Sequence, residues 1–125
     1  MAVQASSVRF GRVGAAWAGA RWAHRAKRQA AAGLSDDGLA AAVDPPPTTE
    51  PGSLRGARVV LGFERATCLE RSFVIQRWWL EYGVPLDVVI GVKSSSSGVK
   101  AHAWVDRFDR DQSDEFQVIR RHTAG

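Results

Sequence analysis

Two residues in the second half of the chain have side chains suited to nucleophilic catalysis. They are Cys68, the only cysteine, and His102. A thiolate can attack a carbonyl carbon, and an imidazole within reach can take the thiol proton and return it to the leaving group. A third polar group normally orients such an imidazole. Aspartates follow the histidine at Asp106, Asp109, Asp111 and Asp114.

The cysteine stands at the start of a predicted helix over residues 68–82. Thr67 and Glu70 have the spacing of a capping box ahead of an apolar run, and Gly83 with Pro85 supplies stop signals. Unpaired N–H groups and the positive end of the helix dipole stabilise a thiolate at such a start. The alternative is a structural cysteine, since free cysteines are often buried.

The histidine falls in the second strand of a predicted hairpin, formed by residues 86–93 and 99–108 around a Ser- and Gly-rich turn. Alternation places His102 and Trp104 on one face of this strand. A third strand is expected over residues 115–121, and Asp114 at its start could turn towards His102. The alternatives are a hydrogen-bonded core histidine and a tryptophan that either shields the site from water or only packs.

Four short motifs accompany these residues in a fixed order. They are Cys68-Leu69-Glu70-Arg71-Ser72, Tyr82-Gly83-Val84-Pro85, Ile90-Gly91-Val92 and Ala101-His102-Ala103-Trp104-Val105. Together, over about residues 55–120, they resemble the leader peptidases of lasso-peptide biosynthesis, which are transglutaminase-like cysteine proteases.

The resemblance implies a Cys-His-Asp triad in chain order, which maps on Cys68, His102 and Asp114. The family's aspartate often follows an asparagine, whereas Ser113 precedes Asp114 here, so Asp109 and Asp111 stay open as alternatives. The resemblance also implies a precursor peptide with its leader as substrate. A small leader-binding protein and a macrolactam synthetase are the implied partners.

The N-terminal segment is basic, with six basic residues and no acid in residues 1–31. Alanine content predicts a helix over 13–32, ended by Gly33, with a poorly defined apolar face and weak packing. A short second helix is predicted from 35 to 43. The basic face is either plainly solvated, a surface for an acidic peptide or partner, a nucleic-acid surface or a transit peptide. Without a base-reading motif nucleic acid is not favoured, so we predict peptide or partner docking.

The length fits one compact domain, in which we distinguish a basic helical segment (1–43), a Pro-rich connector (44–54) and a peptidase core (55–125). The apolar run 58–63 is either a strand or the end of a helix. The expected fold is α+β. N-terminal helices precede a nucleophile-bearing helix packed on a small antiparallel sheet, which the resemblance identifies as a transglutaminase- or papain-like core. His122 and the residues after it are expected to be exposed and frayed.

Several function classes are disfavoured. One cysteine forms no intramolecular disulfide, and no apolar run approaches the length of a membrane span. Three histidines with one cysteine lack metal-ligand spacing, and no nucleotide motif is present, so we expect no metal or cofactor and a cytoplasmic location. Two alternatives to a peptidase remain: acyl transfer to an amine, and a non-catalytic interaction module that would need no thiolate at Cys68.

Overall fold

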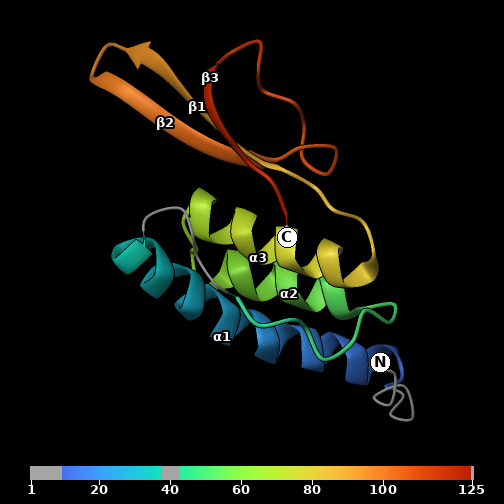
Figure 1. The fold of residues 1–125 in the computed structure, drawn as a ribbon. Helices are drawn as coiled ribbons and strands as arrows, with labels where there is room; N and C mark the ends of the chain where they lie inside the picture. The colour runs from blue at the N-terminus through green and yellow to red at the C-terminus, as the bar shows by residue number, and fades with distance from the viewer. Residues whose placement is uncertain (1–9, 38–42, 125) are drawn as a thin grey trace.

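A computed structural model describes residues 10–37 and 43–124. In these ranges helices come first and strands follow, and the strands form one antiparallel sheet in the order β2-β1-β3. The fold is therefore α+β with a three-stranded antiparallel sheet, as the sequence predicted. The elements are α1 Arg12–Asp37, α2 Ser53–Phe63, α3 Cys68–Tyr82, β1 Val88–Ser95, β2 Gly98–Val105 and β3 Gln117–His122 (Figure 1).

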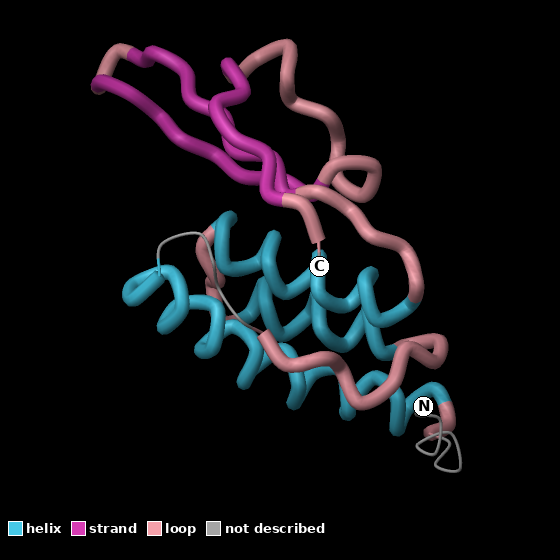
Figure 2. The backbone as a smooth tube through the Cα atoms, in the orientation of Figure 1, coloured by secondary structure: helices cyan, strands magenta, loops and turns pink. Residues whose placement is uncertain are grey.

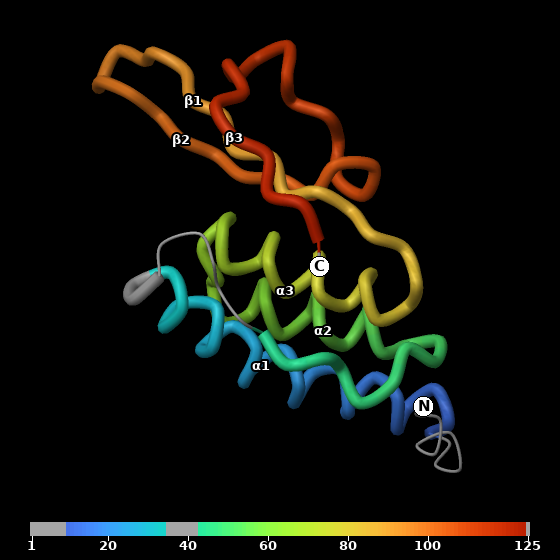
Figure 3. The backbone as a smooth tube through the Cα atoms, viewed as in Figure 1, coloured from blue at the N-terminus to red at the C-terminus, as the bar shows by residue number. Residues whose placement is uncertain are grey.

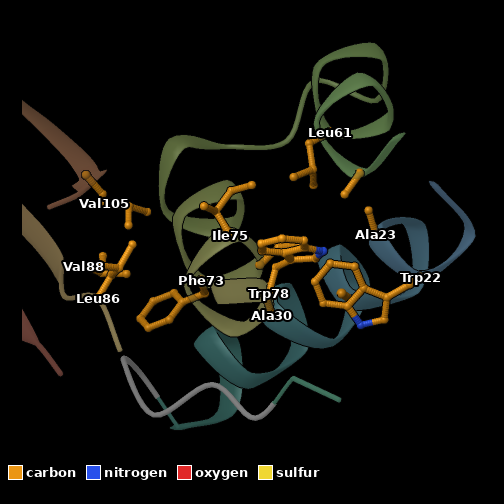
Figure 4. Close-up of a cluster of buried hydrophobic side chains, with 14 residues drawn as sticks. Trp22, Ala23, Ala30, Leu61, Phe73, Ile75, Trp78, Leu86, Val88 and Val105 are labelled. Carbon is orange, nitrogen blue, oxygen red and sulfur yellow. The ribbon is translucent and has the colours of Figure 1, made fainter. Parts of the chain in front are cut away.

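The three helices lie on one side of the sheet (Figure 2). Helix α3 lies between the sheet and α1, and its residues Ile75 and Trp78 are almost fully buried. Trp22 of α1 and Val88 and Val105 of the sheet belong to the same cluster of buried side chains (Figure 4). Because this cluster spans α1, α2, α3 and the sheet, the helix that carries Cys68 is fixed from both sides.

Helix α1 differs from its prediction in length and in packing. It continues through Gly33 to Asp37, so the predicted stop at Gly33 and a separate helix from residue 35 are both wrong, while 38–42 lie outside the described residues. Its packing is not weak, because Trp22 is 2% exposed and Ala23, Ala26 and Ala30 are fully buried.

Small residues allow α1 and α2 to approach closely. A side chain at Gly19 would collide with the backbone of Ser53, and one at Gly56 would collide with the backbone of Ala16. Residues 58–63, which were predicted to be either a strand or the end of a helix, belong to helix α2. The two helices meet backbone to backbone over this stretch.

Residues 43–52 are not helical and run back along α1 to the start of α2 (Figure 3). Hydrogen bonds tie one end of this segment to α1 and the other end to Phe10, just ahead of α1. The indole N–H of Trp22 donates to the Asp44 carbonyl at 2.9 Å, and the Phe10 backbone N–H donates to the Glu50 carboxylate. This return path lets α1 and α2 lie side by side in parallel.

The sheet presents two different faces. Val88, Ala103 and Val105 pack with α3 in the main core, whereas Val89 and Trp104 form a second buried cluster with Phe116 on the other face. Strand positions differ from the prediction by two or three residues at most of their ends. No helix in the described ranges combines the length and apolar character needed to cross a membrane.

The end of β3 is better ordered than predicted. The ring of His122 packs edge-on against Phe73 of α3 at 5.0 Å between centroids, and its carbonyl accepts a hydrogen bond from the Gln76 side chain at 2.9 Å. The same Gln76 amide donates to the Leu86 carbonyl. The expectation of a frayed, exposed His122 was wrong, since this residue helps to anchor the sheet on α3.

Candidate active site

Cys68 is the first residue of α3, as predicted. The Thr67 hydroxyl accepts the Glu70 N–H at 3.1 Å, and the Glu70 carboxylate accepts the Thr67 N–H at 3.0 Å, so the capping box is complete. Gly83 ends the helix in the left-handed region at φ 106°. The thiol is free and half-buried, and it packs against the main core. The fold thus holds Cys68 at the capped start of α3, in its first turn.

His102 lies in β2, opposite Gly91 of the central strand. Its ring is 6.1 Å from Trp104 and 5.5 Å from Phe116, measured between ring centroids. Trp104 is 1% exposed and forms the buried cluster described above. The histidine therefore sits beside a small aromatic cluster, and Gly91 leaves the space that this cluster fills, since a side chain there would collide with Phe116.

Cys68 and His102 are not brought together in this structure. Adjacent residues of a strand point to opposite faces, and Ala103 belongs to the core against which Cys68 packs. His102 points to the opposite face, and no hydrogen bond joins it to the thiol in the described part of the chain.

Asp109 connects the start of α3 with the end of β2. Its carboxylate accepts two hydrogen bonds from the Arg71 guanidinium, each 2.9 Å, and a third from the Val105 N–H at 2.8 Å. Burial opposes ionisation of Asp109, but the hydrogen bonds from Arg71 and Val105 outweigh it and lower the pKa of this carboxyl. Asp109 was predicted only as an alternative triad member, and Arg71, its partner, appeared only as part of the motif that begins at Cys68.

The other two aspartates lie in the segment between β2 and β3. Asp111 accepts hydrogen bonds from the backbone N–H and the hydroxyl of Ser113, and the backbone bond is the main cause that lowers the pKa of its carboxyl. Asp114 is exposed in the turn before β3. Phe116, two residues further on, lies 5.5 Å from the His102 ring between centroids, but no hydrogen bond joins Asp114 itself to His102 in the described part of the chain. The triad assignment to Asp114 stays a prediction.

A metal centre finds no support in the described ranges, where no three or more His, Cys, Asp or Glu side chains gather around a common point. His24, a histidine of α1, instead forms a hydrogen bond with the Glu64 carboxylate at 2.6 Å, and the Lys27 ammonium forms an ion pair with the same carboxylate at 3.0 Å. Side-chain hydrogen bonds from Lys27 and His24 lower the pKa of Glu64. These groups tie α1 to the end of α2.

The chain matches the Transglutaminase-like superfamily over residues 9–121. No curated protein and no solved structure matches it. Because the match covers most of the chain, this protein belongs to the Transglutaminase-like superfamily. The match begins ahead of α1, which accords with the contribution of α1 to the common core.

Proposed function

We propose that this protein is a cysteine peptidase that removes the leader from a ribosomally made precursor peptide, as in lasso-peptide maturation. The observation that carries the proposal is Cys68 at the capped start of α3, inside the span that matches the Transglutaminase-like superfamily. The motifs around Cys68 and His102 support the finer assignment to leader peptidases.

In the proposed reaction the Cys68 thiolate attacks the scissile carbonyl and forms a tetrahedral adduct. His102 takes the thiol proton and gives it to the leaving amine, and water then releases the acid from the thioester. Asp114 would hold the imidazole in the required tautomer. The Cys68 amide N–H, at an open helix end, is a suitable donor to the oxyanion.

This mechanism requires the imidazole and the thiol to meet in the peptide complex. Catalytic hydrogen bonds are often long in unliganded enzymes and tighten when the substrate binds. β3 pairs with β1 only up to residue 92, and beyond this residue the hairpin of β1 and β2 continues as two strands alone. His102 lies opposite Gly91, within the part of the sheet that β3 still pairs with and on the face away from α3, so the proposal requires β2 to shift its register when the precursor binds, which turns His102 to the other face.

The exposed basic face of α1 is proposed to bind the leader-binding protein, from which the precursor would be passed to Cys68. Arg21, Arg25 and Arg28 are all exposed, and an acid-free face attracts acidic surfaces over several ångströms of solvent. A macrolactam synthetase would then take the cut product, all in the cytoplasm. Reversing the three charges should weaken the association and leave Cys68 alkylation unchanged.

The triple reversal also separates the alternatives for this face. Titrations of the leader-binding protein, of its peptide complex and of duplex DNA at low and moderate salt would be compared. Loss of DNA binding with unchanged partner affinity would favour a nucleic-acid role. Unfolding of the variant would show that the charges serve the structure.

The decisive experiment first searches the neighbouring genes for a short precursor, a small leader-binding protein and an asparagine-synthetase-like protein, and then combines the first two with this chain. Mass spectrometry should show leader release by the wild-type chain and none by Cys68→Ala. Full cleavage by Cys68→Ala would refute the proposal. His102→Gln should lose cleavage as well, while still binding the precursor.

Acyl transfer to an amine is the second candidate, because the same thioester serves both reactions. Hydroxylamine added to the assay would intercept the acyl group as a hydroxamate. A product that carries an added amine under ordinary conditions, without hydrolysis, would favour the transferase. A non-catalytic interaction module would leave Cys68 slow towards iodoacetamide and the precursor intact.

A further inference from the structure

Helices α1 and α2 leave an apolar groove of about 880 Å³ between them. Its lining includes Val13, Trp17, Val59 and Phe63, whose exposed fractions lie between 64% and 87%. Single exposed apolar side chains are common, but several together on a rigid surface indicate a binding site. The groove lies on the side of the helix pair away from Trp22 and the rest of the main core.

A second hollow, of about 440 Å³, adjoins the groove along α2. Its lining includes four arginines and no acid. Arg55 and Val59 line both the groove and the hollow, so the two spaces are adjacent. The arginines are Arg55, Arg58, Arg65 and Arg71.

The arginines of the hollow have different partners. Arg71 is held by Asp109, and the Arg58 guanidinium lies 5.3 Å from the centre of the Phe108 ring. Arg55 and Arg65 form no ion pair within the described residues. The hollow thus keeps a net positive charge, since Arg71 alone of the four arginines has an acidic partner in the described residues.

The hollow reaches the start of α3, although Cys68 itself is not among its lining residues. Ala66 and Arg71, which flank Cys68 in the sequence, are both part of its lining. A chain that lies in the groove and continues through the hollow would therefore arrive at the first turn of α3. Taking Cys68 as the reacting group rests on the proposed function.

We propose that the groove and the hollow together bind one peptide segment of the substrate, which places apolar side chains between α1 and α2 and carboxylates among the arginines. The apolar groove favours Leu-like side chains, and Arg55 and Arg65 favour acids. Specificity for an acidic, amphipathic segment next to the cleaved bond follows from this pairing of surfaces.

Other occupants fit less well. A second copy bound by the same surface would face arginine with arginine, because a two-fold contact pairs each patch with itself. Nucleic acid would satisfy the arginines but leave Val13, Trp17, Val59 and Phe63 without apolar partners. The segment before Phe10 carries Arg9 and no acid, so it lacks the complementary charge.

Binding is tested on the full chain with a fluorescent synthetic peptide of leucine and glutamate, followed by anisotropy. Matched peptides replace glutamate by lysine, or leucine by serine. We expect the leucine–glutamate peptide to bind at least about tenfold more tightly than either, the factor that 1.4 kcal/mol represents. Equal binding of the lysine peptide would overturn the proposal.

Paired variants locate the site. Val59→Asp should weaken binding by about ten- to a hundredfold, whereas Val99→Asp, at another exposed valine, in β2, should leave it unchanged. Arg55→Glu should weaken binding and Arg120→Glu, at an exposed arginine of β3, should not. Equal loss of peptide affinity in the two variants of either pair would overturn the proposal. So would a wild-type dimer that becomes monomeric in Val59→Asp.

The two proposals can fail separately. Cys68→Ala should bind the peptide as the wild type does while losing cleavage. Peptide binding that depends on Val59 and Arg55, with no cleavage by the wild-type chain, would leave the peptide site standing and refute the peptidase. Cleavage of the precursor that Val59→Asp and Arg55→Glu do not slow would refute the peptide site and leave the peptidase standing.

Discussion

Asp109→Asn should lower the free energy of unfolding by about 2–3 kcal/mol. The substitution removes the charge that receives two hydrogen bonds from Arg71 and one from the Val105 N–H. Breaking a fully buried ion pair costs about 3–5 kcal/mol. Here the Arg71 and Asp109 side chains keep 30% and 18% of their exposure, so the expected cost lies below that range.

The measurement is urea unfolding at neutral pH. With a slope near 1.5 kcal/mol per molar urea, typical of small domains, the midpoint should fall by about 1–2 M. Asp114→Asn is the matched control, because this exposed residue should change stability by less than about 0.5 kcal/mol. Coincident midpoints for Asp109→Asn and the wild type would refute the structural role of the pair.

The pH dependence of the free energy of unfolding tests the same interaction. Because the folded pKa of Asp109 lies below its ordinary value of 3.8, the unfolded chain binds the proton first as the pH falls. The stabilisation is therefore complete well above pH 4 and is lost as the pH drops through the lower, folded pKa. The difference in the free energy of unfolding between the wild type and Asp109→Asn should become smaller at about pH 2.5. A difference that grows in acid would contradict this account.

The cleavage assay then separates structure from catalysis. If Asp114 orients His102, Asp114→Asn should lose on the order of ten-thousand-fold in rate at unchanged stability. Asp109→Asn and Asp111→Asn should keep cleavage under conditions in which they are folded. Normal cleavage by Asp114→Asn, with loss in one of the other two, would transfer the assignment.

Two further predictions concern α3 and its neighbours. The Ser53 hydroxyl accepts the Trp78 indole N–H at 3.0 Å, whereas the equally buried Ser72 hydroxyl has no partner within the described residues. In urea unfolding, Ser53→Ala should therefore lower the free energy of unfolding by about 1–3 kcal/mol, and Ser72→Ala should not lower it. The reverse order of the two variants would contradict this. Thr67→Ala should lower the free energy of unfolding by about 0.5–2 kcal/mol. It should also slow the alkylation of Cys68 by iodoacetamide, measured by mass spectrometry across pH. An unchanged alkylation rate would show that the cap does not affect the thiol.

Helix α3 was predicted with the correct bounds because its signals are local. Thr67, Glu70 and Gly83 determine the two ends through contacts within a few residues. Alternation likewise placed His102 and Trp104 on one strand face. Which face meets α3 depends on how the sheet packs on the helix, and a period of two residues contains no information on that choice.

The interactions that were missed join residues far apart in the sequence. Arg71 and Asp109 are 38 residues apart, and nothing near either one indicates the pair. Helix α1 gave the same difficulty, because a face of alanines shows little hydrophobic contrast until a second helix approaches it. Gly33 was taken as a stop, although a glycine inside a helix costs only about 1 kcal/mol, which the packed neighbouring turns outweigh.

The backbone contact of Gly19 with Ser53, and of Gly56 with Ala16, has a kinetic consequence. Helices that touch through their main chains can neither slide nor separate without losing the contact, so the width of the groove beside them is fixed before a peptide arrives. Association should then be a single diffusive step, with an observed rate that rises linearly with peptide concentration and reaches no plateau. Little ordering entropy is lost on the protein side, so even a short segment can be held long enough to react.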